Sequence, residues 1–238
     1  MVDGNHKMRD LKVLYEDNHI IVVVKPFNIP SQGDKTGDID MLTIIKQYIK
    51  EKYNKPGDVY LGLVHRLDRP TGGVMVFART SKAASRLSEQ IRTNSFEKKY
   101  LAVINGRMEE PNATLEDYLY KLQKSNTSYV VRPNKKDAKQ AILEYSEKAY
   151  NQEKDLSLME IKLKTGRHHQ IRVQFASRGH SLYGDQKYGL KQNSKYGKKQ
   201  LALWAYSLSF NHPTLNNRLL FEENPPQSGI WSIFENDI

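Results

Sequence analysis

The segment from His65 to Ala78, HRLDRPTGGVMVFA, constrains the fold of this chain more than any other. Its turn residues, Pro70 to Gly73, separate two runs of strand-forming residues, Leu61 to Val64 and Val74 to Phe77. The spacing predicts a strand, a loop that presents Asp68, and a second strand. Because basic residues surround it, the Asp68 carboxylate should stay ionised. Such a carboxylate can act as a nucleophile or as a base; a surface Asp in a salt-bridged turn is the simpler alternative.

Composition narrows the class of protein. The 238 residues suit one sizeable domain, and the formal net charge of +10 suits a polyanionic partner such as nucleic acid. A basic protein kept soluble by its charge is the alternative. The absence of cysteine excludes disulfides and thiol ligands and is consistent with the cytoplasm. No apolar run approaches the roughly 20 residues of a membrane-spanning helix, and MVDGNHKMRD lacks the apolar core of a signal peptide. We therefore expect a cytoplasmic protein with no membrane partner.

The first half of the chain predicts alternating strands and helices. The run from Ile20 to Val24 is β-branched throughout, as in a buried strand. Asp40 should cap a helix with apolar residues at helical spacing, and Ser81 should cap a second one. Tyr100 to Ile104 has the composition of a further strand.

The second half predicts more antiparallel sheet. Ala141 to Tyr150 and Asp155 to Lys164 should form a pair, with a bulge between Leu158 and Met159, where the alternation changes phase. Gly166 should begin a turn into a helix, followed by a left-handed Gly179. Leu201 to Phe210 should form a late strand. We expect an α+β fold in a single domain over residues 1–238, with residues 1–10 as a flexible N-terminus.

Four blocks of sequence occur in the order and at roughly the spacings of one enzyme family. They are IVVVKPFNIPSQGD (21–34), HRLDRPTGG (65–73), KKYLAVINGR (98–107) and KTGRHHQIRVQFASRGHSLYGDQKYG (164–189). On these blocks the chain resembles the RluA-type RNA pseudouridine synthases. The resemblance implies an isomerase that converts specific uridines of ribosomal RNA or transfer RNA to pseudouridine and needs no cofactor or metal.

The resemblance also implies an architecture. Members of this family share a mixed, mostly antiparallel central sheet with flanking helices and a central RNA-binding cleft. Many carry a small N-terminal RNA-binding domain. Only about ten residues precede the first expected strand here, so we expect no such domain and a catalytic domain that binds RNA alone, as a monomer.

The family's site residues can be carried over position by position. Asp68 matches the catalytic Asp, which either attacks C1′ or removes the 2′ proton to give a glycal. Arg167 matches the Arg that pairs with this Asp. Tyr100 lies where the family places a phenol over the uracil face, for stacking or proton transfer. Arg66 resembles the Arg that some members insert into the stack left by the flipped base; a phosphate contact is the alternative. His65 is an RNA-binding candidate, although an orienting or packed histidine is the simpler reading.

A second basic segment extends from Lys187 to Gln200, KYGLKQNSKYGKKQ. We expect a loop in which Lys187, Lys195, Lys198 and Lys199 contact phosphates while Tyr188 and Tyr196 meet sugars or bases. A solvated loop whose lysines only aid solubility is the alternative.

Three positions depart from the family pattern. Thr71-Gly72-Gly73 replaces a common Thr-Ser-Gly and loses a hydroxyl. His168 stands where Thr is common, before a matching His169, and Trp204 stands where His is common. None of these is a candidate catalytic position, so we expect activity and leave the substrate preference open.

Other functions fit the sequence less well. A metal site lacks the HExxH pattern, and adjacent His168 and His169 on a helix would point about 100° apart. A nucleoside glycosidase would usually use a second carboxylate, and the only nearby acid, Asp185, lies in a stretch of structural character. A catalytically silent RNA-binding protein or RNA chaperone with this fold is the remaining alternative.

Overall fold

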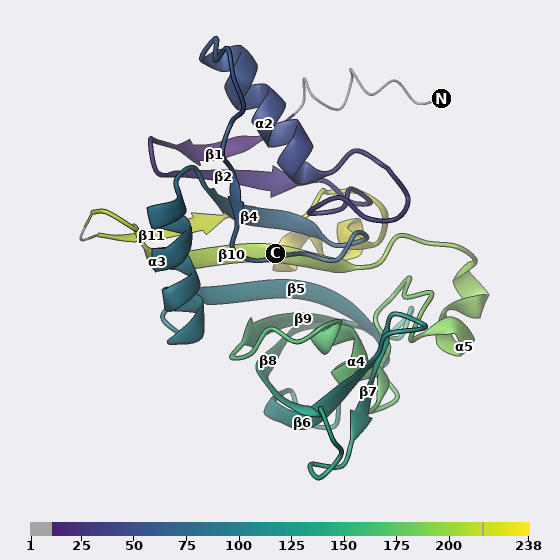
Figure 1. Ribbon diagram of the computed structural model, residues 1–238. Helices are drawn as coiled ribbons and strands as arrows, with labels where there is room; N and C mark the ends of the chain where they lie inside the picture. The colour runs from purple at the N-terminus through teal and green to yellow at the C-terminus, as the bar shows by residue number, and fades with distance from the viewer. Residues whose placement is uncertain (1–10, 216) are drawn as a thin grey trace. The chain divides into compact units, whose positions relative to one another are not determined.

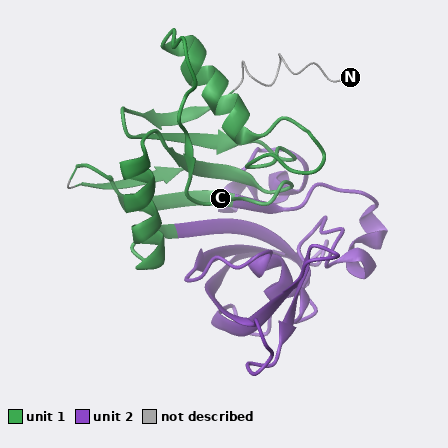
Figure 2. Ribbon diagram, viewed as in Figure 1, with its two compact units in different colours: residues 1–97, 205–223 green, residues 98–204, 224–238 purple. Residues whose placement is uncertain are grey.

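The computed structural model describes residues 11–215 and 217–238 (Figure 1). The expectation of a flexible N-terminus over residues 1–10 therefore lies outside the described residues. The chain divides into two compact units, which are coloured separately in Figure 2. Unit 1 ends at Glu97 and takes up the chain again at Ala205–Glu223; unit 2 comprises Lys98–Trp204 and Asn224–Ile238. The expectation of a single domain stays a prediction.

Unit 1 is built on antiparallel strands that the apolar runs predict. The strands are β1 (Val13–Glu16), β2 (Ile20–Lys25), β3 (Gly62–Leu63), β4 (Gly72–Ala78), β10 (Leu203–Asn211) and β11 (Arg218–Glu222). Their order is β1-β2-β4-β10, with β3 also paired to β4 and β11 to β10. Every residue of β2 and β4 is buried, as expected for strands covered on both faces.

Two helices accompany this sheet. Helix α2 (Met41–Lys52) begins where predicted, because the Asp40 carboxylate accepts hydrogen bonds from the backbone of the first turn. Helix α3 (Ser81–Arg92) is capped by Thr80, whose hydroxyl accepts from Ala83 N, so the prediction of a Ser81 cap was wrong by one residue. Helix α3 packs its buried side chains into the same apolar cluster as β2, β4 and β10.

Unit 2 contains an antiparallel meander. Its strands are β5 (Glu97–Asn105), β6 (Asn112–Leu122), β7 (Thr127–Val131), β8 (Lys139–Asn151) and β9 (Leu156–Leu163), in the order β5-β9-β8-β6-β7. The predicted bulge lies at the expected place in the pairing but on the other strand. The register shifts between Glu147 and Ala149 of β8, opposite Met159 and Leu158, so Lys148 is the extra residue.

Short helices complete unit 2. They are α4 (Gln170–Ala176), α5 (Leu190–Asn193), η1 (Ser194–Tyr196) and η2 (Gly229–Asp237). Helix α4 contacts β6 and β7, and Gly179 after it is left-handed (φ 84°), as predicted. None of the helices described could cross a membrane. Sheets with flanking helices confirm the predicted α+β class.

Candidate active site

A buried lysine, Lys25, forms hydrogen bonds to the backbone of the loop that presents Asp68. Lys25 ends strand β2 and is fully buried. Its ammonium donates to the backbone carbonyls of Pro26 at 3.0 Å, Arg69 at 3.1 Å and Thr71 at 2.7 Å. One cation therefore fixes the backbone on the C-terminal side of Asp68. No role for Lys25 was predicted from the sequence, although a lysine that ends an otherwise apolar buried strand is a visible signal.

Burial and the charge of Asp68 have opposite effects on the pKa of Lys25. Burial lowers the pKa of this ammonium to about 7, because desolvation disfavours its charged form, while the negative charge of Asp68 opposes this shift. The charge of Arg69 lowers the pKa further. Lys25 and Asp68 therefore interact electrostatically beneath the loop.

The N-terminal side of Asp68 is fixed by Ser31. Its buried hydroxyl donates to Leu67 O at 2.8 Å and accepts from Leu67 N at 3.1 Å. Beyond Asp68, Thr71 N donates to Asp68 O at 2.9 Å and closes the turn. The backbone of this loop is thus bonded immediately before and after Asp68, which limits the positions its carboxylate can adopt.

Gly73, which matches the Gly of the family pattern, lies against the backbone of a neighbouring strand. Its φ is +119°, and an added Cβ would lie 2.2 Å from Ala205 O of strand β10. Only glycine fits so close to a neighbouring backbone.

The two basic residues before Leu67 have different surroundings. The His65 ring packs against Phe96, and its Nε2 accepts a hydrogen bond from Val76 N at 3.1 Å. These contacts favour the orienting role of His65 over direct RNA binding. Arg66 is exposed, so its guanidinium is accessible to an RNA.

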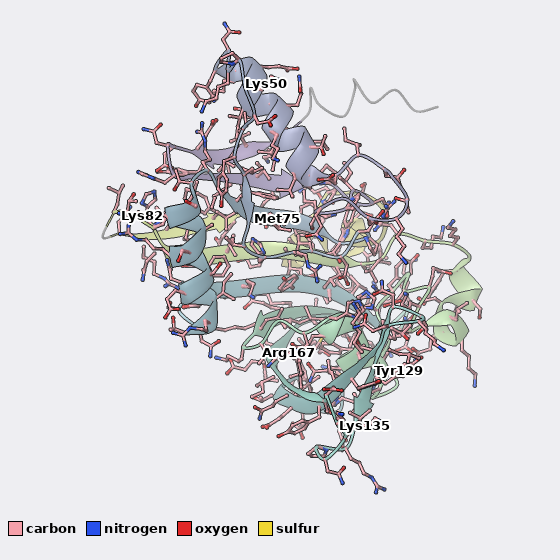
Figure 3. All side chains as sticks on the ribbon, in the orientation of Figure 1. Lys50, Met75, Lys82, Tyr129, Lys135 and Arg167 are labelled. Carbon is pink, nitrogen blue, oxygen red and sulfur yellow. The ribbon has the colours of Figure 1, made fainter. Side chains whose placement is uncertain are left out.

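Tyr100 and Arg167 belong to unit 2. Tyr100 lies within β5, opposite Ile161 of β9, and only 7% of its surface is exposed. Arg167 is exposed and precedes α4; its Nε donates to Gln140 O at 2.7 Å, and its backbone N donates to Gln170 Oε1 at 3.0 Å (Figure 3). The backbone at Arg167 is thus held by the helix that follows it.

The paired histidines lie before α4 and not on it. His169 is left-handed (φ 54°) and is the N-cap residue, and its ring stacks on that of His168 with centroids 3.7 Å apart. The expectation that the two rings diverge by about 100° on a helix was therefore wrong. His168 Nδ1 lies 2.8 Å from Ser128 Oγ, and His169 Nδ1 lies 2.7 Å from Tyr188 Oη. Burial, followed by the charge of Arg172, lowers the pKa of His169 to about 3, which keeps it neutral.

Asp185 is structural, as its sequence context indicates. Its buried carboxylate accepts two hydrogen bonds from Arg172, at 2.7 and 2.8 Å, and others from the backbone of Lys187 and Tyr188. Burial opposes ionisation of Asp185, but the bonds from Arg172 prevail and lower its pKa. This ion pair fixes the start of the basic segment, and the sequence analysis missed Arg172.

The basic segment from Lys187 to Gln200 is more ordered than a loop. It forms α5 and η1, and buried Asn193 bonds to the backbone of Gly184, Leu182 and Asp185. The Tyr188 hydroxyl accepts a hydrogen bond from Ser128 N, so it is held within unit 2; the expected contact of Tyr188 with sugars or bases stays a prediction.

The lysines of this segment differ in their contacts. Lys187 donates to Asn126 O at 3.0 Å, so its charge is partly used within unit 2. Lys195, Lys198 and Lys199 are exposed, and the Lys195 ammonium lies 4.8 Å from the centre of the Tyr196 ring. These three lysines keep the surface position that phosphate contacts require.

Among residues 11–215 and 217–238, no group of three or more His, Cys, Asp or Glu side chains could hold a metal ion.

This arrangement of motif and loop agrees with the comparison to known families. Residues 19–177 match the family described as RNA pseudouridylate synthase. The chain belongs to this family and is an RNA pseudouridine synthase, an isomerase. The sequence-based assignment to the RluA-type synthases is confirmed.

Individual relatives cover most of the chain. An uncharacterized RNA pseudouridine synthase of Aquifex aeolicus is 33% identical over 228 residues, 92% of this chain and 70% of that protein. The ribosomal large subunit pseudouridine synthase C of Buchnera aphidicola (subsp. Acyrthosiphon pisum) is 29% identical and covers 90% of this chain and 68% of its own length. The structure of human RNA Pseudouridylate Synthase Domain Containing 4 shares the fold, with a TM-score of 0.78, 24% identity, and coverage of 94% of this chain and 93% of that one.

Proposed function

We propose that this synthase isomerises specific uridines of ribosomal RNA with Asp68 as its catalytic carboxylate. The observation that supports this role is the loop itself. Lys25 and Ser31 fix the backbone on both sides of Asp68, so the carboxylate is positioned before substrate binds. Such preorganisation is what a reacting group needs.

The chemistry requires no oxidant or reductant. The N1–C1′ bond of uridine breaks, the base turns, and a C5–C1′ bond forms. The proton on C5 is then lost and N1 gains a proton, so the product is an isomer of the substrate. The ionised Asp68 either attacks C1′ to form a covalent bond or removes the 2′ proton to give a glycal. Both routes need the negative charge of Asp68.

The family motif suggests roles for three further residues. We propose that Arg167 pairs with Asp68, which would orient the carboxylate. Tyr100 would stack on the uracil and assist proton transfer. Arg66, exposed two positions before Asp68, would occupy the stack that the flipped nucleotide leaves, since guanidinium planes stack well on bases.

Large-subunit ribosomal RNA is the target we favour. Support comes from the name of the Buchnera relative, a ribosomal large subunit pseudouridine synthase, and from the net charge of +10, which suits a polyanion. Transfer RNA is the other outcome of the test. We also propose that the enzyme acts in the cytoplasm as a monomer and without metal.

Mapping of pseudouridine tests this proposal. Total RNA from cells with and without the gene should differ at one or a few uridines of large-subunit ribosomal RNA. Wild-type protein should restore them, and Asp68→Asn should not. A lost site in transfer RNA would redirect the substrate and leave the mechanism standing. Unchanged RNA, with purified protein that binds RNA but does not modify it, would favour the silent RNA-binding alternative.

A further inference from the structure

Arg69, the residue that follows Asp68, makes contacts that the proposed chemistry does not use. Its Nη2 donates to both carboxylate oxygens of Asp34, at 3.0 and 2.9 Å. Its Nη1 donates to Oδ2 of Asp38, and Nη2 also contacts Thr36 Oγ1. Two carboxylates from one loop therefore hold a single guanidinium. We call Asp34, Asp38 and Arg69 the carboxylate clamp.

The loop that carries the two acids is preorganised by Thr36. Its backbone N–H donates to Asp34 Oδ1 at 2.9 Å, and its hydroxyl donates to the same oxygen at 2.6 Å. Thr36, followed by Arg69, lowers the pKa of Asp34 to about 2, since these donors favour the charged carboxylate. Asp34 therefore stays ionised over the whole range in which an enzyme works.

The segment that carries the two acids also contacts the residues immediately before and after Asp68. Ser31 bonds to the backbone of Leu67, while Asp34, three residues later, binds the side chain of Arg69. Residues 31–38 thus contact each neighbour of Asp68.

We propose that Asp34 and Asp38 are positioning residues for the reaction, because they fix the turn that carries Asp68 and neutralise the cation beside it. This inference rests on the catalytic role of Asp68 proposed above. Without the two acids, the Arg69 guanidinium would lose the partners that hold it and could compete with Arg167 for the Asp68 carboxylate. The turn would also lose contacts that restrict its backbone, and small displacements of a reacting group are costly.

A different role for the clamp predicts different kinetics. Arg69 is 32% exposed, so released from its acids it could contact an RNA phosphate. If the acids served only to limit RNA binding, their removal would tighten binding and steepen its salt dependence. If they position Asp68, their removal lowers turnover and leaves KM nearly unchanged.

Kinetics of the neutralised clamp separate these roles. The variant Asp34→Asn/Asp38→Asn is compared with Glu109→Gln/Glu110→Gln, which removes two charges from exposed acids of unit 2. We expect kcat to fall by about 10- to 100-fold in the clamp variant, with KM within about twofold, and the control to match wild type. In an Arg69→Met background the same two substitutions should change kcat little further, since their partner is already gone.

Three results would overturn the inference. They are an unchanged kcat in the clamp variant, a change confined to RNA binding, and equal losses with and without Arg69. The single variants Asp34→Asn and Asp38→Asn give the same test if the double variant does not fold. Asp68→Asn is measured in parallel: an active Asp68→Asn enzyme would refute the catalytic assignment itself, whereas an inactive one beside a fully active clamp variant would refute only the clamp.

Discussion

Lys25 and the lysines of the Lys187–Gln200 segment show two opposite uses of one residue type. Lys25 is buried, and its ammonium donates to backbone carbonyls around Asp68. Lys195, Lys198 and Lys199 are exposed, and the segment that carries them is fixed by Asn193 and Asp185 instead. A buried lysine can fix the position of one loop at the cost of desolvation, whereas exposed lysines supply charge that a polyanion meets. Burial, more than residue type, decides what each lysine does.

The largest effect on folding should come from the anchor of the exposed lysines. Asp185→Asn leaves Arg172 buried without its anionic partner, so the free energy of unfolding should fall by about 3–5 kcal/mol. Chemical denaturation measures this change. Glu144→Gln, which breaks the exposed pair with Lys164, should cost at most about 1 kcal/mol. Equal effects from the two substitutions would mean that Asp185 does not anchor the segment.

The next effect concerns the buried lysine and depends on pH. Burial lowers the pKa of Lys25 to about 7 in the folded chain, against 10.5 for an ordinary lysine, so between these values the unfolded chain binds more protons. Stability should therefore rise with pH across this window, by up to about 1.4 kcal/mol per pH unit. Denaturation curves of Lys25→Met should lack this slope, and the variant should also lose activity because the carbonyls around Asp68 lose their donor.

A matched control sharpens the pH experiment. Lys50 lies exposed near the end of α2 (Figure 3), so Lys50→Met should keep the wild-type slope and the wild-type activity. If Lys25→Met and Lys50→Met gave the same pH dependence, Lys25 would not titrate as its burial predicts.

Arg167→Met should separate activity from stability. Removing a well-buried partner of Asp68 would lower both activity and stability. Arg167, however, is exposed, and substitutions of exposed residues usually change the free energy of unfolding by about 0.5 kcal/mol or less. We therefore expect turnover to fall at least about tenfold, equivalent to about 1.4 kcal/mol, with little change in the melting temperature. Full activity of Arg167→Met would show that Arg167 does not act with Asp68.

The smallest effect is expected from the exposed lysines. In Lys195→Gln/Lys198→Gln/Lys199→Gln, each lost phosphate contact should reduce the slope of log affinity against log salt by about 0.7–0.9. RNA titrations at several salt concentrations measure the slope, and turnover at saturating RNA should hardly change. A slope equal to that of wild type would place the RNA on another part of the basic surface.

Local patterns in the sequence predict most of the strands and the loop at Asp68. The continuous apolar run of β2 and the turn residues around Pro70 carry their own structural signal. Adjacent hydroxyl residues explain the error at α3, because both Thr80 and Ser81 can cap a helix and Ser is the stronger cap by type. The bulge was predicted on β9 from its change of phase between Leu158 and Met159, but the extra residue lies on β8, because a register shift affects both strands of a pair and the phase of one strand does not show which of them carries the insertion.

Contacts between distant segments account for what the sequence did not predict. The hydrogen bonds of His168 and Tyr188 depend on Ser128 of β7, which lies 40 and 60 residues before them. The role of Lys25 depends on carbonyls 44 and 46 residues away. No local periodicity encodes such partners. The residues that hold the candidate site in place were therefore harder to predict than the sequence motif that contains Asp68.

The central claim is that the negative charge of Asp68 performs the chemistry. Release of tritium from uracil C5 tests it, with wild type and Asp68→Asn assayed on the same labelled RNA and RNA binding measured on the same preparations. The account predicts that Asp68→Asn binds RNA with near wild-type affinity and releases no tritium above background. Release at a rate near that of wild type would contradict it.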